Sequence, residues 1–162
     1  MPIEETSLGT WDSLHREHLE IFTKVNLLES ALIDFLQKRT AGPVAVNSDL
    51  QRDFLEAFKH GITLHFAVEE AALFPAMRKM GKTATTLVDK LLVEHRSIME
   101  KYGKTVHAAD AEEKRGILLQ LIQELAAHTQ KEEKFVSPIV AQMSLGQQRE
   151  VDQTAKRLGY VV

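Results

Sequence analysis

The sequence contains no cysteine among its 162 residues, which excludes disulfide bonds, thiolate metal sites, iron–sulfur clusters and cysteine nucleophiles. It has only 8 glycines and 4 prolines, the residues that most often interrupt helices. It also lacks an apolar run long enough to cross a bilayer, and its first ten residues carry no hydrophobic segment of the signal-peptide type. We therefore expect a cytoplasmic protein that does not bind membranes.

Neither sign of charge predominates in the sequence. The 20 basic and 23 acidic residues give a net charge of -3, and no basic block interrupts the chain, so we do not expect nucleic acid as a partner. The hydrophobic fraction of 44% and the charged fraction of 27% are typical of a soluble globular protein. The length fits one domain over residues 1–162.

Apolar residues recur every three or four positions, which predicts an all-α fold. We expect long helices over about 10–39, 48–80 and 110–143, and a further one that starts after Thr83 to Thr86 and runs to about 107, all joined by short connections. The expected start signals are a capping box at Ser48 and the pair Asp110 and Glu113, and Gly81 is the expected stop of the second helix. These features predict an up-down-up-down four-helix bundle over about residues 10–142. A short C-terminal helix, over about 144–159, should pack across one end.

Two pairs of motifs repeat along the chain. The sequence H-x-x-x-E-E, followed by proline, occurs at residues 65–75 and again at 128–138. The pair E-H occurs at residues 17–18 in the first predicted helix and at 94–95 in the third. The chain therefore reads as two related helical hairpins.

Each long helix carries a histidine on the stripe that should face the core. These histidines are His18, His65, His95 and His128, and the second and fourth helices add Glu69 and Glu132 one turn later. At a rise of about 1.5 Å per residue, all six fall at one level of the bundle, within a turn or two. The same stripes are expected to bury Phe35, Tyr102 and Phe135.

Burying these imidazoles and carboxylates without partners would cost several kcal/mol per ionised group. A bound cation reverses this balance, because it attracts the carboxylates and accepts the imidazole lone pairs. The donor set suits iron, zinc, copper or nickel, and the absence of thiolate argues against softer ions. The spacing of four residues in each H-x-x-x-E allows one ion to bind both side chains, or the carboxylate to bridge two ions.

These motifs are similar to those of the hemerythrin-like family, the HHE cation-binding domain, over roughly residues 10–142. The resemblance implies a non-haem di-iron centre with two iron ions, although other divalent metals remain open. The oxygen carriers of the family have a second histidine where this chain has Met99, and an aspartate five residues after the last histidine instead of Glu132. His15 is the candidate for an additional ligand. The implied ligands are His18, His65, Glu69, His95, His128 and Glu132.

The resemblance implies binding of a small ligand such as O2, NO or peroxide, in sensing, storage or stress response. The alternatives are an enzyme that decomposes peroxide or NO on the same centre, and a metal-free helical interaction module. Catalytic residues and a homodimer are left open. Of the neighbouring acids, we expect Glu70 and Glu133 to be solvated or to support the ligands, and Glu17 and Glu94 to be surface acids.

Overall fold

The computed structural model describes residues 9–38 and 44–160, with the side chains of 35–38 and 44–48 outside the description. The predicted all-α class is confirmed. The expectation for Phe35 lies outside the described side chains. The elements in chain order are α1 (Gly9–Lys38), α2 (Val44–Ala57), η1 (Phe58–Ile62), α3 (Thr63–Val68), η2 (Glu69–Leu73), α4 (Phe74–Arg78), α5 (Lys82–His107), α6 (Ala111–Ala141) and α7 (Leu145–Arg157).

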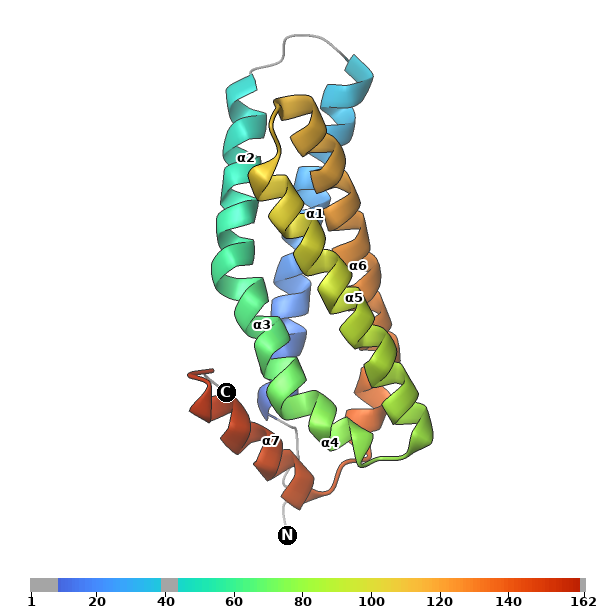
Figure 1. The fold of residues 1–162 in the computed structure, drawn as a ribbon. Coiled ribbons are helices and arrows are strands. Elements are labelled where there is room, and N and C mark those ends of the chain that lie inside the picture. Colours follow the sequence, from blue (N-terminus) through green and yellow to red (C-terminus); the bar gives the residue numbers. More distant parts are fainter. Residues whose placement is uncertain (1–8, 39–43, 161–162) are drawn as a thin grey trace.

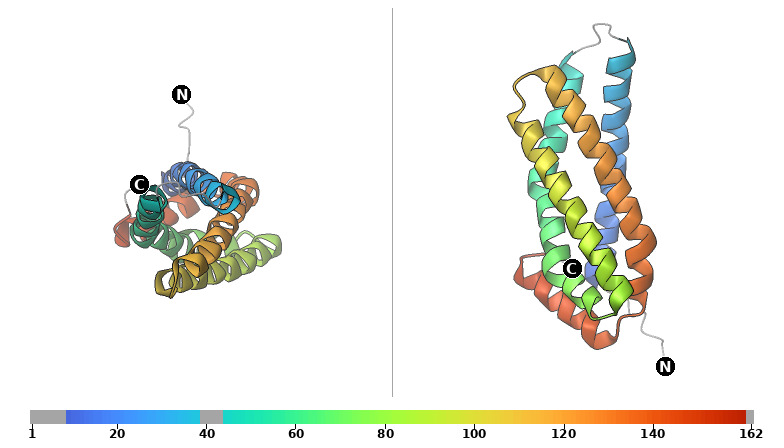
Figure 2. Two further views of the ribbon diagram at one scale, coloured as in Figure 1. Left: turned by 90° about the horizontal axis from the view of Figure 1, so that it is seen from above. Right: turned by 45° about the vertical axis from the view of Figure 1, so that its right-hand side comes forward.

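Long helical rods lie side by side along one axis. Three are α1, α5 and α6, and the fourth is the continuous run from α2 to α4 (Figure 1). The short α7 lies across the end of these rods at which α1 begins, as Figure 1 and the right view of Figure 2 show. A hydrogen bond of 2.9 Å from the backbone N–H of Thr10 to Oδ1 of Asp152 joins α7 to the start of α1.

Local signals set several helix ends. The side chain of Asp110 accepts a hydrogen bond of 2.8 Å from the N–H of Glu113, as predicted. Ser144 and Gln147 form a capping box at the start of α7. Gly81 has φ of 122° between α4 and α5. Residues other than glycine rarely adopt this backbone conformation, so Gly81 permits the sharp reversal there.

Two predicted helix starts are wrong. The second helix begins at Val44 instead of Ser48. The third begins at Lys82, ahead of the threonines at which we placed its start. Thr85 and Thr86 fit within its first turns because their hydroxyls donate to the carbonyls of Gly81 and Lys82.

The run from α2 to α4 contains two wider, π-helical turns, η1 and η2, on either side of α3. Such turns insert into an α-helix and often occur at functional sites. Pro75 lies in the first turn of α4, just after η2, and has no N–H to donate to the preceding turn. His65 lies in α3 and Glu69 opens η2, so both residues lie in or beside these irregular turns.

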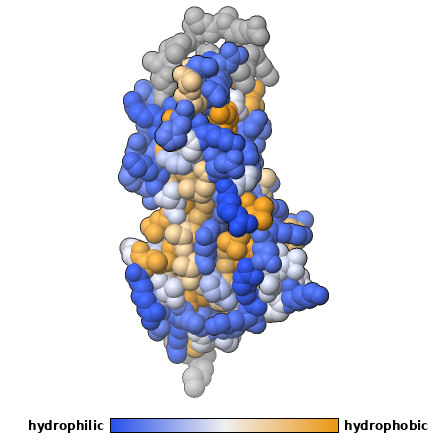
Figure 3. Space-filling model, in the orientation of Figure 1, coloured by the Kyte–Doolittle hydropathy of each residue, from blue (hydrophilic) through white to orange (hydrophobic). Residues whose placement is uncertain are grey.

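The hydrophobic core forms two clusters along the bundle. The lower cluster, near α7, includes Trp11, Phe74 and Met77, and the upper cluster includes Phe58, Phe66 and Leu121. The predicted packing of Tyr102 is confirmed, because its ring stacks on Phe58 with centroids 4.3 Å apart. On the face of the molecule drawn in Figure 3, hydrophobic residues lie among hydrophilic ones.

The prediction that Phe135 faces the core is wrong. Its side chain is 48% exposed, whereas the neighbouring Val136 is fully buried. The buried stripe of α6 continues from Glu132 to Val136 and Val140, because a helix of 3.6 residues per turn drifts away from a strict alternation of three and four. The amine of Lys134 lies 5.2 Å from the centre of the exposed Phe135 ring.

Candidate metal centre

Six polar side chains fill the layer between the two hydrophobic clusters, and each is no more than 2% exposed. They come from α1, α3, η2, α5 and α6, so four separate passes of the chain contribute to one site. Two groups of potential ligand atoms, each within 4.8 Å, share the same pair of carboxylates. The structure thus brings together all six residues named from the sequence: His18, His65, Glu69, His95, His128 and Glu132.

Each carboxylate directs one oxygen to each group. Oε1 of Glu69 lies 3.0 Å from Nε2 of His65, and its Oε2 lies 3.1 Å from Nε2 of His95. Oε1 of Glu132 lies 3.0 Å from Nε2 of His128, and its Oε2 lies 3.1 Å from Nε2 of His18. The result is an approximately two-fold arrangement in which two nitrogens and two oxygens face each of two adjacent positions.

The atoms at the centre of this layer lack ordinary partners. The four carboxylate oxygens of Glu69 and Glu132 are buried without a hydrogen-bond partner. Nε2 of His18 lies 3.0 Å from Nε2 of His65, and the same atoms of His95 and His128 are 3.1 Å apart. When both facing imidazoles carry only their Nδ1 proton, their Nε2 lone pairs repel each other at this distance. One cation in each group satisfies the nitrogens and oxygens together, so the residues fit a pair of metal ions.

The pKa values of the buried histidines and glutamates also show that this layer favours positive charge. Burial lowers the pKa of His18 and His95, but the nearby carboxylates of Glu132 and Glu69 outweigh burial and raise both to about 10. Burial raises the pKa of Glu132, as does the charge of Glu69, yet His128 and His18 hold it down at about 2. A layer that attracts protons this strongly also attracts metal cations, which compete with protons for the same lone pairs.

The outward-facing nitrogen of every site histidine bonds a glutamate on another element. A carboxylate only accepts, so each Nδ1 carries the proton and each Nε2 faces the centre of the layer. The four Nδ1–H groups donate as follows: His18 to Glu133 at 2.5 Å, His65 to Glu17 at 2.6 Å, His95 to Glu70 at 2.8 Å, and His128 to Glu94 at 2.8 Å.

These four bonds explain the paired motifs of the sequence. In each E-H pair, the glutamate holds the histidine of the following helical rod, as Glu17 holds His65. In each E-E pair, the first glutamate faces the centre, whereas the second holds a histidine of the other hairpin, as Glu133 holds His18. The expectation that Glu17 and Glu94 are merely surface acids is therefore wrong. The signal that could have identified them was their repeated position directly before a site histidine.

Aromatic rings close the layer above and below. Phe66 stacks on His95 with centroids 3.8 Å apart and an interplanar angle of 12°, and its edge meets His128. Trp11 packs edge-on against His18 from the opposite cluster, with centroids 5.8 Å apart. These contacts restrict rotation of the imidazoles and keep water away from their inner nitrogens.

His15 and Met99 lie outside this layer. The His15 side chain is 47% exposed, and its Nδ1 bonds Glu133 at 2.8 Å. It belongs to neither group of potential ligands among the residues that the structure describes. Met99 is 37% exposed, whereas the adjacent Ile98 is fully buried, so the position one turn after His95 faces the surface here.

Comparisons with known proteins agree with this geometry. The family model described as the hemerythrin HHE cation binding domain matches residues 10–140. Neither the curated proteins nor the solved structures compared with the chain gave a match. No helix within residues 9–38 and 44–160 is long and apolar enough to span a membrane. Because the match covers most of the sequence and includes all six clustered residues, the chain belongs to the hemerythrin HHE cation-binding domain family.

Proposed function

We propose that the six clustered residues hold two iron ions in a non-haem di-iron centre, which binds O2, NO or peroxide in sensing, storage or stress response. The observation that carries this proposal is the pair of buried ligand groups that share Glu69 and Glu132. The course of the chain in Figure 1 supports an up-down-up-down four-helix bundle as its framework. Iron bound there would supply open coordination positions and reversible redox chemistry.

The protein contributes orientation and exclusion of water. The Nδ1–H bonds fix the tautomer of each histidine, so that Nε2 is available at the centre without rearrangement. The two glutamates face both positions and bring two negative charges to the site. The hydrophobic clusters on both sides keep bulk water from competing for the inner donor atoms.

Metal analysis tests the proposal directly. The chain loaded anaerobically with ferrous iron and then oxidised should contain about two irons, as the two ligand groups imply. Its visible absorption should change when azide or peroxide is added. Replacing Glu132 with Ala should abolish this spectrum, whereas Glu56→Ala, at an exposed position outside the layer, should leave it unchanged. A folded chain that takes up no iron would contradict the proposal.

A metal-free interaction module makes the opposite prediction. Ligands that bind only the folded state raise its melting temperature by mass action. Chelation of the iron-loaded protein should therefore lower the melting temperature, whereas a module that needs no metal would melt at the same temperature. Steady turnover of peroxide or NO, lost in Glu132→Ala, would identify an enzyme on the same centre.

A further inference from the structure

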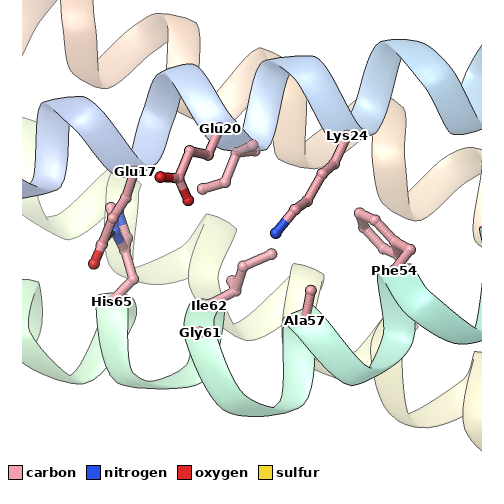
Figure 4. Close-up of a pocket in the computed structure, with 9 residues that line it drawn as sticks. Glu17, Glu20, Lys24, Phe54, Ala57, Gly61, Ile62 and His65 are labelled. Carbon is pink, nitrogen blue, oxygen red and sulfur yellow. Dashed lines mark hydrogen bonds and ion pairs between the residues drawn. The ribbon is translucent and has the colours of Figure 1, made fainter.

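A small pocket lies against the outer side of the proposed centre, between α1 and the run from α2 through η1 to α3. Its volume is about 120 Å³, well above the ~10–15 Å³ that one water needs. Figure 4 shows Glu17 and His65 at one end of the pocket and Phe54 at the other. His65 is one of the six clustered residues, its Nε2 faces Glu69, and the same residue also lines the pocket.

The lining combines an apolar wall with a few charged groups. Ile21, Phe54 and Ile62 supply the apolar side, whereas Glu20 and Lys24 reach over the pocket from α1 (Figure 4). At its inner end, the carboxylate of Glu17 accepts the Nδ1–H bond of His65, and the Glu17 side chain is 38% exposed. Glu17 is thus the contact between the buried histidine and the open pocket.

Gly61 keeps this pocket open. It lies in the π-helical turn η1. Glycine is unfavourable in the interior of a helix, so its presence there calls for a reason. A Cβ atom built at Gly61 would meet nothing within 4 Å, so no close packing requires glycine there. The missing side chain leaves space on the wall of the pocket instead.

We propose that this pocket is the entry site for the small ligand of the centre, and that the Glu17–His65 pair forms its inner gate. This inference rests on the proposed function. The apolar wall and the mixed hydrogen-bonding groups suit a small neutral molecule that both donates and accepts hydrogen bonds, such as hydrogen peroxide. Two carboxylates against one amine disfavour small anions.

Filling the pocket tests the route without changing a ligand. Ala57→Phe and Gly61→Leu add bulk to two lining positions one turn apart, and Gly116→Leu is a control at an exposed glycine of α6 with no neighbour within 4 Å. In the iron-loaded proteins, stopped-flow absorption should show that both filling variants slow the reaction with peroxide about tenfold or more. Iron content and the starting spectrum should stay at the wild-type values.

The outcomes separate the two proposals. Normal iron loading with unchanged peroxide rates in both filling variants overturns the entry site, whereas absence of iron from the wild-type chain overturns the proposed function. Charge supplies an independent test with azide. Glu20→Gln should raise the azide association rate about two- to threefold at low salt, and the difference should vanish at high salt. Equal azide rates at low salt would also contradict entry through this pocket.

Discussion

Removing the glutamate behind a site histidine should weaken metal binding by an amount that depends on how well water replaces it. Glu133 and Glu70 occupy equivalent places in the two hairpins, and each holds a histidine of the other hairpin. Glu133 is 27% exposed and lies 2.5 Å from Nδ1 of His18, whereas Glu70 is 46% exposed and lies 2.8 Å from Nδ1 of His95. Water can therefore substitute for Glu70 more readily than for Glu133.

Loss of such an outer partner typically costs about 10–100-fold in metal affinity, or ~1.4–2.7 kcal/mol. The loss of metal affinity in Glu70→Ala should fall near the lower end of this range, because Glu70 is 46% exposed and water can replace its carboxylate. Glu133→Ala should fall near the upper end, since its other oxygen also accepts a bond from His15 and fixes the carboxylate. The expected difference between the two variants is therefore about tenfold, or ~1.4 kcal/mol.

Competition with a chelator of known affinity measures both variants on the same scale. Glu56→Ala is the matched control, because Glu56 is 63% exposed on α2 and contacts only His60 among the ion pairs described. Urea unfolding of the metal-free variants separates lost affinity from lost stability. The reasoning would be refuted by a Glu70→Ala variant that loses as much affinity as Glu133→Ala, or by two variants that bind metal like the control.

Three further outcomes follow from the same structure. Burial lowers the pKa of His18 and His95, but Glu132 and Glu69 raise both to about 10. The protons bound by these two histidines stabilise the metal-free protein fully below about pH 6.5. This stabilisation is lost as the pH rises to 10. The protein's melting temperature should therefore fall between about pH 6 and pH 9, while the increase caused by metal grows, and parallel melting curves with and without chelator would contradict this. Phe66→Ala should destabilise the metal-free protein by about 3–5 kcal/mol in urea, because it removes a ring packed on His95; a loss below ~1 kcal/mol would show that the ring contributes little packing. Gly61→Ala should raise stability by about 0.5–1 kcal/mol, because the added methyl has space and reduces the entropy of the unfolded chain; a destabilised variant would show that η1 requires glycine.

The sequence was sufficient to predict the residues of the candidate site because their signals are local and periodic. Helical spacing places His65 and Glu69, or His128 and Glu132, on one face, and the distance from each helix end fixes their depth. The cap at Asp110 was equally predictable, since it depends on a residue three positions away. The convergence of these side chains therefore followed from counting residues along helices.

The rotation of each helix about its axis, and its packing on its neighbours, were decided only by the tertiary structure. The pattern within one helix does not reveal the bonds of Glu17 and Glu94, because their partners, His65 and His128, lie on other elements. The strict spacing of three and four predicts a buried Phe135, but the buried face of α6 shifts by one residue, so that Val136 is buried and Phe135 is exposed. The pocket beside His65 also depends on a π-helical turn that periodicity does not reveal. Local sequence specifies which groups reach the centre, whereas packing between helices decides what holds them there and how a ligand approaches.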